Sequence, residues 1–196
     1  MRVKKGDFGY ISYKKKKNIF FALAMVLVGV VIFVVGLLLN KMSNRNIFTV
    51  IAMLFSLPFS KFLVGFIVLF PYASVDREKY ERVKKVLPDN MELMTDLVVT
   101  SSEKVMHLDF IAVGNGQVIG LIGKRGQEVG YIRKYLSDGV HNWGSGYNVK
   151  IVEGEKIFLQ ELQRQSAKSK PDVEENMEAS EEEETNVKSY LRSLIV

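Results

Sequence analysis

The chain has no cysteine, only two histidines and a single tryptophan among its 196 residues. The absence of cysteine fits a reducing compartment and equally fits a bacterial membrane protein, so it decides neither. No metal-binding spacing surrounds His107 or His141. The chain also lacks a G-x-S-x-G nucleophile motif, and the segment GKRG at Gly123 lacks the upstream glycine and the following Ser/Thr of a phosphate-binding loop. We therefore predict neither a metal nor a cofactor.

Charged residues are absent from residues 19–39, a run of 21 positions, and residues 47–70 are interrupted only by Lys61. At 1.5 Å per residue, each run is long enough to cross about 30 Å of hydrocarbon. A cleaved signal peptide would have a shorter apolar region, about 7–15 residues, ending in small residues. The sequence thus predicts an N-terminal two-helix transmembrane hairpin over residues 19–70.

Lysine and arginine are concentrated on the flanks of this hairpin. Residues 1–18 form a basic N-terminus with seven such residues, residues 77–85 hold five more, and the connection between the two runs has only Lys41 and Arg45. Basic residues stay on the cytoplasmic side and attract anionic headgroups. This pattern predicts a two-pass membrane protein with both termini in the cytoplasm and with membrane lipid as a partner of the basic N-terminus.

Small and helix-breaking residues lie inside the runs. Ala22, Gly29 and Gly36 recur every seven positions, which favours close packing between the two helices of one chain or, alternatively, a dimer seam. Pro58 predicts a kink, and Lys61 is expected to extend its stem toward the headgroups. Whether residues 59–70 complete the span or lie at the interface stays open.

Residues 71–165 change to the pattern of a small α/β domain. We predict a helix over 75–86 that starts at Ser74, a strand over 92–100, and two strands joined by Asn115-Gly116, a strong hairpin signal. A helix that Gly139 ends, a further strand and a last helix follow. The expected order is α-β-β-β-α-β-α.

The segment HLDFIAVGNGQVIGLIGK, together with this order, resembles the core of restriction-endonuclease-like nucleases and the nuclease-related domain of some bacterial membrane proteins. In that family one strand opens with an aspartate, and Glu-x-Lys closes the next strand. The resemblance matches Asp109 to the first carboxylate and Lys124 to the lysine. It also relates Gln127 and Tyr131 to a glutamine and a tyrosine of the following helix.

The acidic position of the pattern holds Ile122, and one carboxylate is a poor cage for Mg²⁺. Asp109 and Lys124 are therefore candidates for a vestigial site rather than catalytic residues. Alternatively Asp109 lies on the exposed face of the hairpin and Lys124 is a solvated strand end, or a second carboxylate such as Asp96 or Glu103 completes the site. The whole chain also resembles uncharacterised two-helix membrane proteins of Gram-positive bacteria, a resemblance that implies the bacterial cytoplasmic membrane as its location.

Residues 71–165 carry 13 basic and 13 acidic residues, so this domain is neutral and nucleic acid is an unfavoured partner. Trp143 lies in a glycine-containing loop, where we expect it to anchor the loop to the core rather than to stack on a ligand.

Residues 166–185 contain eight acidic residues and are predicted to be a disordered linker. Residues 186–196 regain apolar positions along one helical face. We expect this short amphipathic segment to dock on a protein groove, in preference to the membrane surface. The apolar positions are Val187, Tyr190, Leu191, Leu194 and Ile195.

These patterns favour a membrane-tethered, non-catalytic protein whose α/β domain and C-terminal segment bind a protein partner or a second copy. A membrane-bound metal-dependent nuclease using Asp109 and Lys124 is the alternative. A third hypothesis is an accessory subunit of a membrane assembly or transporter, which requires Ala22, Gly29 and Gly36 to face lipid.

Overall fold

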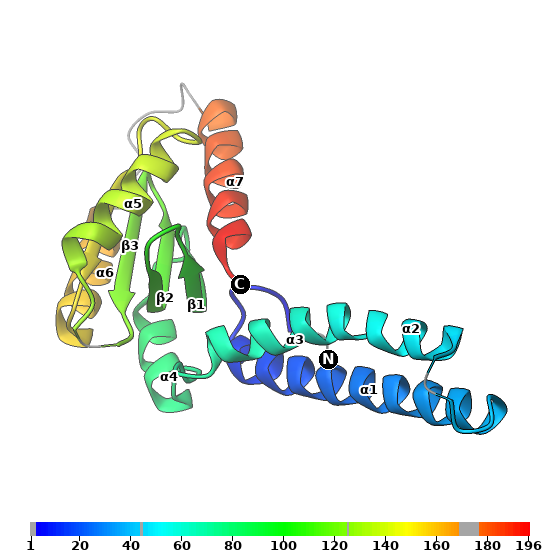
Figure 1. Cartoon of the computed structure of the whole chain (residues 1–196). Helices are drawn as coiled ribbons and strands as arrows, with labels where there is room; N and C mark the ends of the chain where they lie inside the picture. Colours follow the sequence, from blue (N-terminus) through cyan, green and yellow to red (C-terminus); the bar gives the residue numbers. More distant parts are fainter. Residues whose placement is uncertain (1–2, 44, 125, 169–176) are drawn as a thin grey trace. The chain divides into compact units, whose positions relative to one another are not determined.

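A computed structural model describes residues 3–43, 45–124, 126–168 and 177–196. The chain divides into two compact units (Figure 1). The hairpin unit comprises residues 12–71, and the α/β unit combines the N-terminal residues up to Ile11 with residues 72–196. The described residues before Tyr10 thus belong to the α/β unit, whereas the sequence predicted a separate basic N-terminus and a domain over residues 71–165.

The hairpin unit contains α1 (Tyr10–Leu39), α2 (Ile47–Leu54) and α3 (Ser56–Leu69). Within the described residues, Tyr10–Leu39 and Ile47–Leu69 are the two helices that are long and apolar enough to cross a membrane. The second is interrupted at Phe55, between α2 and α3. Pro58 is the third residue of α3, so its missing N–H falls in the first turn, where an amide has no intrahelical partner.

The small residues of α1 face the second helix of the same chain. A Cβ at Gly29 would lie 3.5 Å from Cβ of Phe55, and one at Gly36 would overlap the side chain of Phe48. Ala22 is buried. The packing of the two helices against each other is confirmed, whereas the hypothesis that these residues face lipid is wrong.

Polar and aromatic contacts continue toward the ends of the hairpin. Phe21 stacks on Phe62 with ring centroids 5.2 Å apart, and Lys15 Nζ donates to the carbonyl of Phe70 at 2.9 Å. Lys61 is exposed on α3. Residues 59–69 are helical, and α3 therefore continues the second helix to Leu69.

The α/β unit has the predicted order followed by one more helix. Its elements are α4 (Arg77–Val86), β1 (Glu92–Thr100), β2 (Val105–Gly114), β3 (Gln117–Ile122), α5 (Val129–His141), β4 (Asn148–Val152), α6 (Glu155–Lys168) and α7 (Met177–Leu194). The strands form one mixed sheet in the order β1-β2-β3-β4, with β3 and β4 parallel and the other pairs antiparallel. This order alone does not establish a restriction-endonuclease-like fold.

Local signals locate these elements well. β1 has the predicted bounds, and Asn115 and Gly116 both have positive φ, as a type I′ turn requires. Helix α4 starts two residues later than predicted because the Asp76 side chain, rather than Ser74, caps it by accepting from the amide of Glu78. Gly139 does not end α5, which continues to His141.

The sheet is covered on both faces. Alternate residues of β2 enter two separate cores: Leu108 and Ile111 pack with α5 and α7, and Phe110 and Ala112 pack with α4 and α6. Helix α7 lies beside β1 (Figure 1). Its buried residues are Val187 and Leu191, and Ile195 beyond its end pairs with Val99 of β1.

Two predictions for the C-terminal region are thus wrong. The linker predicted to be disordered over 166–185 is helical at both ends, since α6 reaches Lys168 and α7 begins at Met177; residues 169–176 lie outside the described residues. The apolar face at 186–196 packs on the chain's own sheet, because burying it there removes it from water without a second protein.

Candidate functional site

Asp109 lies at an irregularity of the sheet. Leu108 pairs with Ile122 and Phe110 with Leu121, so Asp109 is the additional residue of a β-bulge in β2. On the neighbouring strand, Asp96 occupies the matching position between two regular pairs and has a φ of +57°. Both carboxylates are buried: the exposed fractions are 0% for Asp96 and 9% for Asp109.

The cation beside Asp109 is Lys79 of α4. Lys79 Nζ forms an ion pair with Asp109 Oδ2, and its side chain is 23% exposed. His107 Nε2 lies 4.0 Å from Asp109 Oδ1. A Cβ at Gly123, the residue after β3, would overlap both Asp109 and His107. The absence of a side chain at Gly123 therefore leaves room for these two side chains. The carboxylate is surrounded by the protein itself and has little room for a metal ion with its water ligands.

Lys124, the other predicted site residue, contacts an aromatic ring. Its Nζ lies 5.7 Å from the centroid of the Tyr72 ring, and Tyr72 in turn stacks on His107 at 4.9 Å. Burial raises the pKa of the Tyr72 hydroxyl. Lys124 therefore lies at the edge of the group formed by Tyr72, His107 and Asp109. The residue that neutralises Asp109 is Lys79. Sequence reasoning missed Lys79 because it lies 30 residues from Asp109 and is one of several lysines of α4.

Ile122 faces the other side of the sheet from Asp109. It packs in the core formed with α5 and α7, whereas Leu121 packs in the core formed with α4 and α6. A carboxylate at position 122 would thus not meet Asp109. Among the described residues, no group of three histidine, aspartate or glutamate side chains is arranged to hold a metal ion.

Asp96 is already bonded to backbone amides. Its Oδ1 accepts from the amide of Val75 at 2.8 Å, and its Oδ2 accepts from the amide of Ile11 at 3.4 Å. Burial raises the pKa of the Asp96 carboxyl, although hydrogen bonds from Val75, Ser74, Ile11 and Gly9 act in the opposite direction. Asp96 therefore holds the chain segments immediately before and after the hairpin unit. Glu103 lies in the exposed β1–β2 turn, with its amide bonded to Ser101 Oγ.

Gln127 and Tyr131 also have internal partners. The Gln127 side chain accepts from the amide of His107 at 2.7 Å and donates to its carbonyl at 2.8 Å, which extends the pairing of β2 beyond β3. The Tyr131 hydroxyl is 2.9 Å from Ser101 Oγ. These contacts account for both residues without a ligand.

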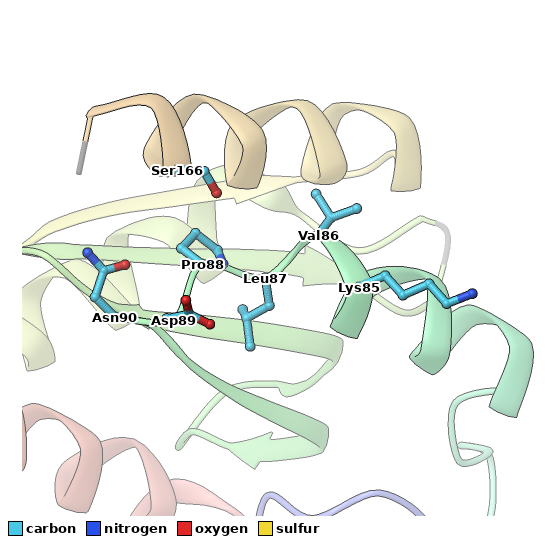
Figure 2. A pocket seen from close by; sticks show the side chains of 7 residues that line it. All are labelled: Lys85, Val86, Leu87, Pro88, Asp89, Asn90 and Ser166. Carbon is cyan, nitrogen blue, oxygen red and sulfur yellow. The ribbon is translucent and has the colours of Figure 1, made fainter. Parts of the chain in front are cut away.

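Several pockets open on the α/β unit, among them two of more than 400 Å³. One, of about 420 Å³, is lined by Tyr72, Lys104, Met106, Gln127 and Tyr131 among others. The other, of about 480 Å³, lies between the α4–β1 connection and Ser166 near the end of α6 (Figure 2). The second pocket contains none of the predicted site residues.

Trp143 is not a buried anchor: it is 51% exposed and stacks on Tyr190 of α7, with ring centroids 6.2 Å apart. The hydroxyl of Tyr190 occupies the space that a Cβ at Gly139 would need. We call Trp143, Tyr147 and Tyr190, together with Glu183 of α7, the Trp143 surface. Sequence reasoning missed Tyr147 and Glu183 because only the docking of α7 brings Tyr190 and Glu183 to this loop.

No family model, curated protein or solved structure matches the chain. The resemblances to nuclease-related domains and to two-helix membrane proteins of Gram-positive bacteria therefore stay predictions.

Proposed function

We propose that this chain is a two-pass protein of the bacterial cytoplasmic membrane whose α/β unit is non-catalytic and binds another protein. The observation that carries the proposal is the Trp143 surface, where a half-exposed tryptophan stacks on a tyrosine of a second helix. Tryptophan and tyrosine are enriched at the centres of protein interfaces.

The proposed orientation has support of two kinds. Residues before and after the hairpin belong to one compact unit, held by hydrogen bonds such as that from the amide of Thr95 to the carbonyl of Gly6 at 2.8 Å. Both flanks of a membrane-spanning hairpin would then lie on one side. The basic residues of these flanks favour the cytoplasm as that side.

A nuclease-like enzyme is the less favoured proposal. The order of elements supports a relationship to restriction-endonuclease-like proteins, but the ion pair with Lys79 and the position of Ile122 argue against a metal site at Asp109. Incubation of the full chain with single- and double-stranded nucleic acids and Mg²⁺ or Mn²⁺ should yield no cleavage. Cleavage that Asp109→Asn abolishes would replace the binding proposal with the enzymatic one.

The binding proposal is tested by photo-crosslinking in intact membranes. A photoreactive amino acid at position 143 of the full chain should yield a discrete protein adduct, identified by mass spectrometry. The matched position is 157, because Ile157 of α6 is equally exposed, at 50% against 51% for Trp143. Adducts that are the same from both positions, or none from position 143, would contradict the proposal. An adduct of two copies of this chain would identify the partner as a homo-oligomer.

A further inference from the structure

The rings at the Trp143 surface continue along α5. Tyr131 and Tyr135 are one helical turn apart, and their centroids are separated by 6.4 Å with an interplanar angle of 13°. The next position of this face is Gly139, where Tyr190 of α7 packs. Trp143 follows one turn later. Two helices thus build a single row of aromatic rings.

The Trp143 end of this row is acidic. Glu183 lies four residues before Val187 and seven before Tyr190, which places it on the side of α7 that meets the loop after α5. Val187 Cγ2 would lie 2.8 Å from a Cβ at Gly144 in that loop. Burial, followed by the nearby charges of Glu184 and Glu183, raises the pKa of the Tyr147 hydroxyl to about 12. The carboxylates are thus electrostatically close to the exposed rings.

These carboxylates are not all neutralised. Glu184 forms an ion pair with Lys188 at 2.6 Å. In the part of the chain that the structure describes, no lysine or arginine lies within ion-pair distance of Glu182 or Glu183. Glu183 is therefore electrostatically close to the rings, with no lysine or arginine of the described residues paired to it.

We propose that the Trp143 surface binds an arginine-rich segment of a partner protein, with a guanidinium stacked on Trp143 and paired with Glu183. The guanidinium is the side chain that both stacks on aromatic faces and pairs with carboxylates. The same carboxylates repel phosphates, which disfavours nucleic acid and anionic lipid as occupants. This inference rests on the proposed function and identifies the chemistry of the partner.

The test uses the full chain in nanodiscs of phosphatidylcholine, a lipid without net charge, and a fluorescein-labelled peptide of six arginines. Binding is followed by fluorescence anisotropy. The double variant Glu182→Lys/Glu183→Lys should weaken binding by about tenfold or more, and Trp143→Ala by about fivefold. The matched control, Glu81→Lys/Asp89→Lys, makes the same change of net charge at exposed positions of α4 and the α4–β1 connection, and should change binding by less than about twofold.

Equal weakening by both double variants would show that only net charge attracts the peptide, and would overturn the inference. Unchanged binding of the peptide by Trp143→Ala would also overturn the inference. The same holds if oligothymidine or phosphatidylserine nanodiscs bind this surface more tightly than the arginine peptide does. The crosslinking adduct at position 143 shows whether only the arginine inference fails or whether the proposed protein binding fails as well. If the adduct persists in Glu182→Lys/Glu183→Lys, the chain binds a protein but not through arginine.

Discussion

Tyr190 of α7 fills the notch that Gly139 leaves in α5. A methyl group at position 139 would collide with the Tyr190 hydroxyl and ring. The two residues are 51 positions apart in the sequence, yet the absence of one side chain allows the other to dock. Loss of this fit should loosen the C-terminal helix from the sheet.

Gly139→Ala should therefore destabilise the α/β unit by about 1–3 kcal/mol, as overpacking typically does. In an unconstrained helix the same change would stabilise by up to about 1 kcal/mol. Urea unfolding of the full chain in detergent can be followed by the fluorescence of Trp143, the only tryptophan, which lies against Tyr190. Gly130→Ala is the matched control because a Cβ there meets nothing within 4 Å; equal effects of the two changes would contradict this contact.

Asp96→Ala should lower the free energy of unfolding by about 2–4 kcal/mol, because it leaves buried amides such as those of Val75 and Ile11 without an acceptor. The segments flanking the hairpin should exchange amide hydrogens faster, which mass spectrometry can measure. Asp89→Ala removes an exposed carboxylate and should change neither property. Unchanged protection at residues 9–11 and 74–75 would show that Asp96 does not hold these segments.

The free energy of unfolding should change with pH in the way that the raised pKa of the Asp96 carboxyl requires. Burial raises its folded-state pKa above the ordinary value of 3.8, so the native state binds more protons than the unfolded state between these two pKa values. Asp96 therefore stabilises the fold less when the pH is above its folded-state pKa. Its contribution increases as the pH falls from that pKa toward 3.8. Relative to Asp96→Asn, the wild-type chain should gain stability as the pH falls through the raised folded-state pKa of Asp96 toward 3.8. A stability difference that is constant with pH, or that moves the other way, would contradict the raised pKa.

Ile122→Glu should destabilise the unit by about 3–5 kcal/mol, since it puts a carboxylate without a partner in the core between the sheet and α5. Mg²⁺ should not restore the loss, because Asp109 lies on the opposite face. Ile157→Glu, at a half-exposed position of α6, should leave stability within about 0.5 kcal/mol. Stabilisation of Ile122→Glu by Mg²⁺ in a thermal scan would instead indicate a metal pocket.

A double-mutant cycle on Lys79 and Asp109 should give a coupling energy of about 1–3 kcal/mol, because both side chains are largely buried. The corresponding cycle on Arg82 and Glu155, whose side chains are 53% and 30% exposed, should give a smaller value because solvent screens that pair. Coupling of Asp109 to Lys124 rather than to Lys79 would restore the pairing that the nuclease resemblance implies.

Much of the fold could be predicted because its signals are local. Two long apolar runs predict the hairpin, and a short segment rich in Leu, Met and Val predicts β1. The turn at Asn115-Gly116 is determined by the positive φ that both residues tolerate. Such features depend on a few neighbouring residues, so the order of the elements could be read along the chain.

The sequence alone predicts the apolar face within α7 and the apolar strand that contains Asp109. Tertiary packing docks α7 on its own sheet, buries Asp109 beside Lys79, and lets Asp96 hold both flanks of the hairpin. A β-bulge at Asp109 changes which face the following residues of β2 point to, so strand alternation alone does not relate Asp109 to Ile122. These contacts join residues far apart in the chain, and packing decides them.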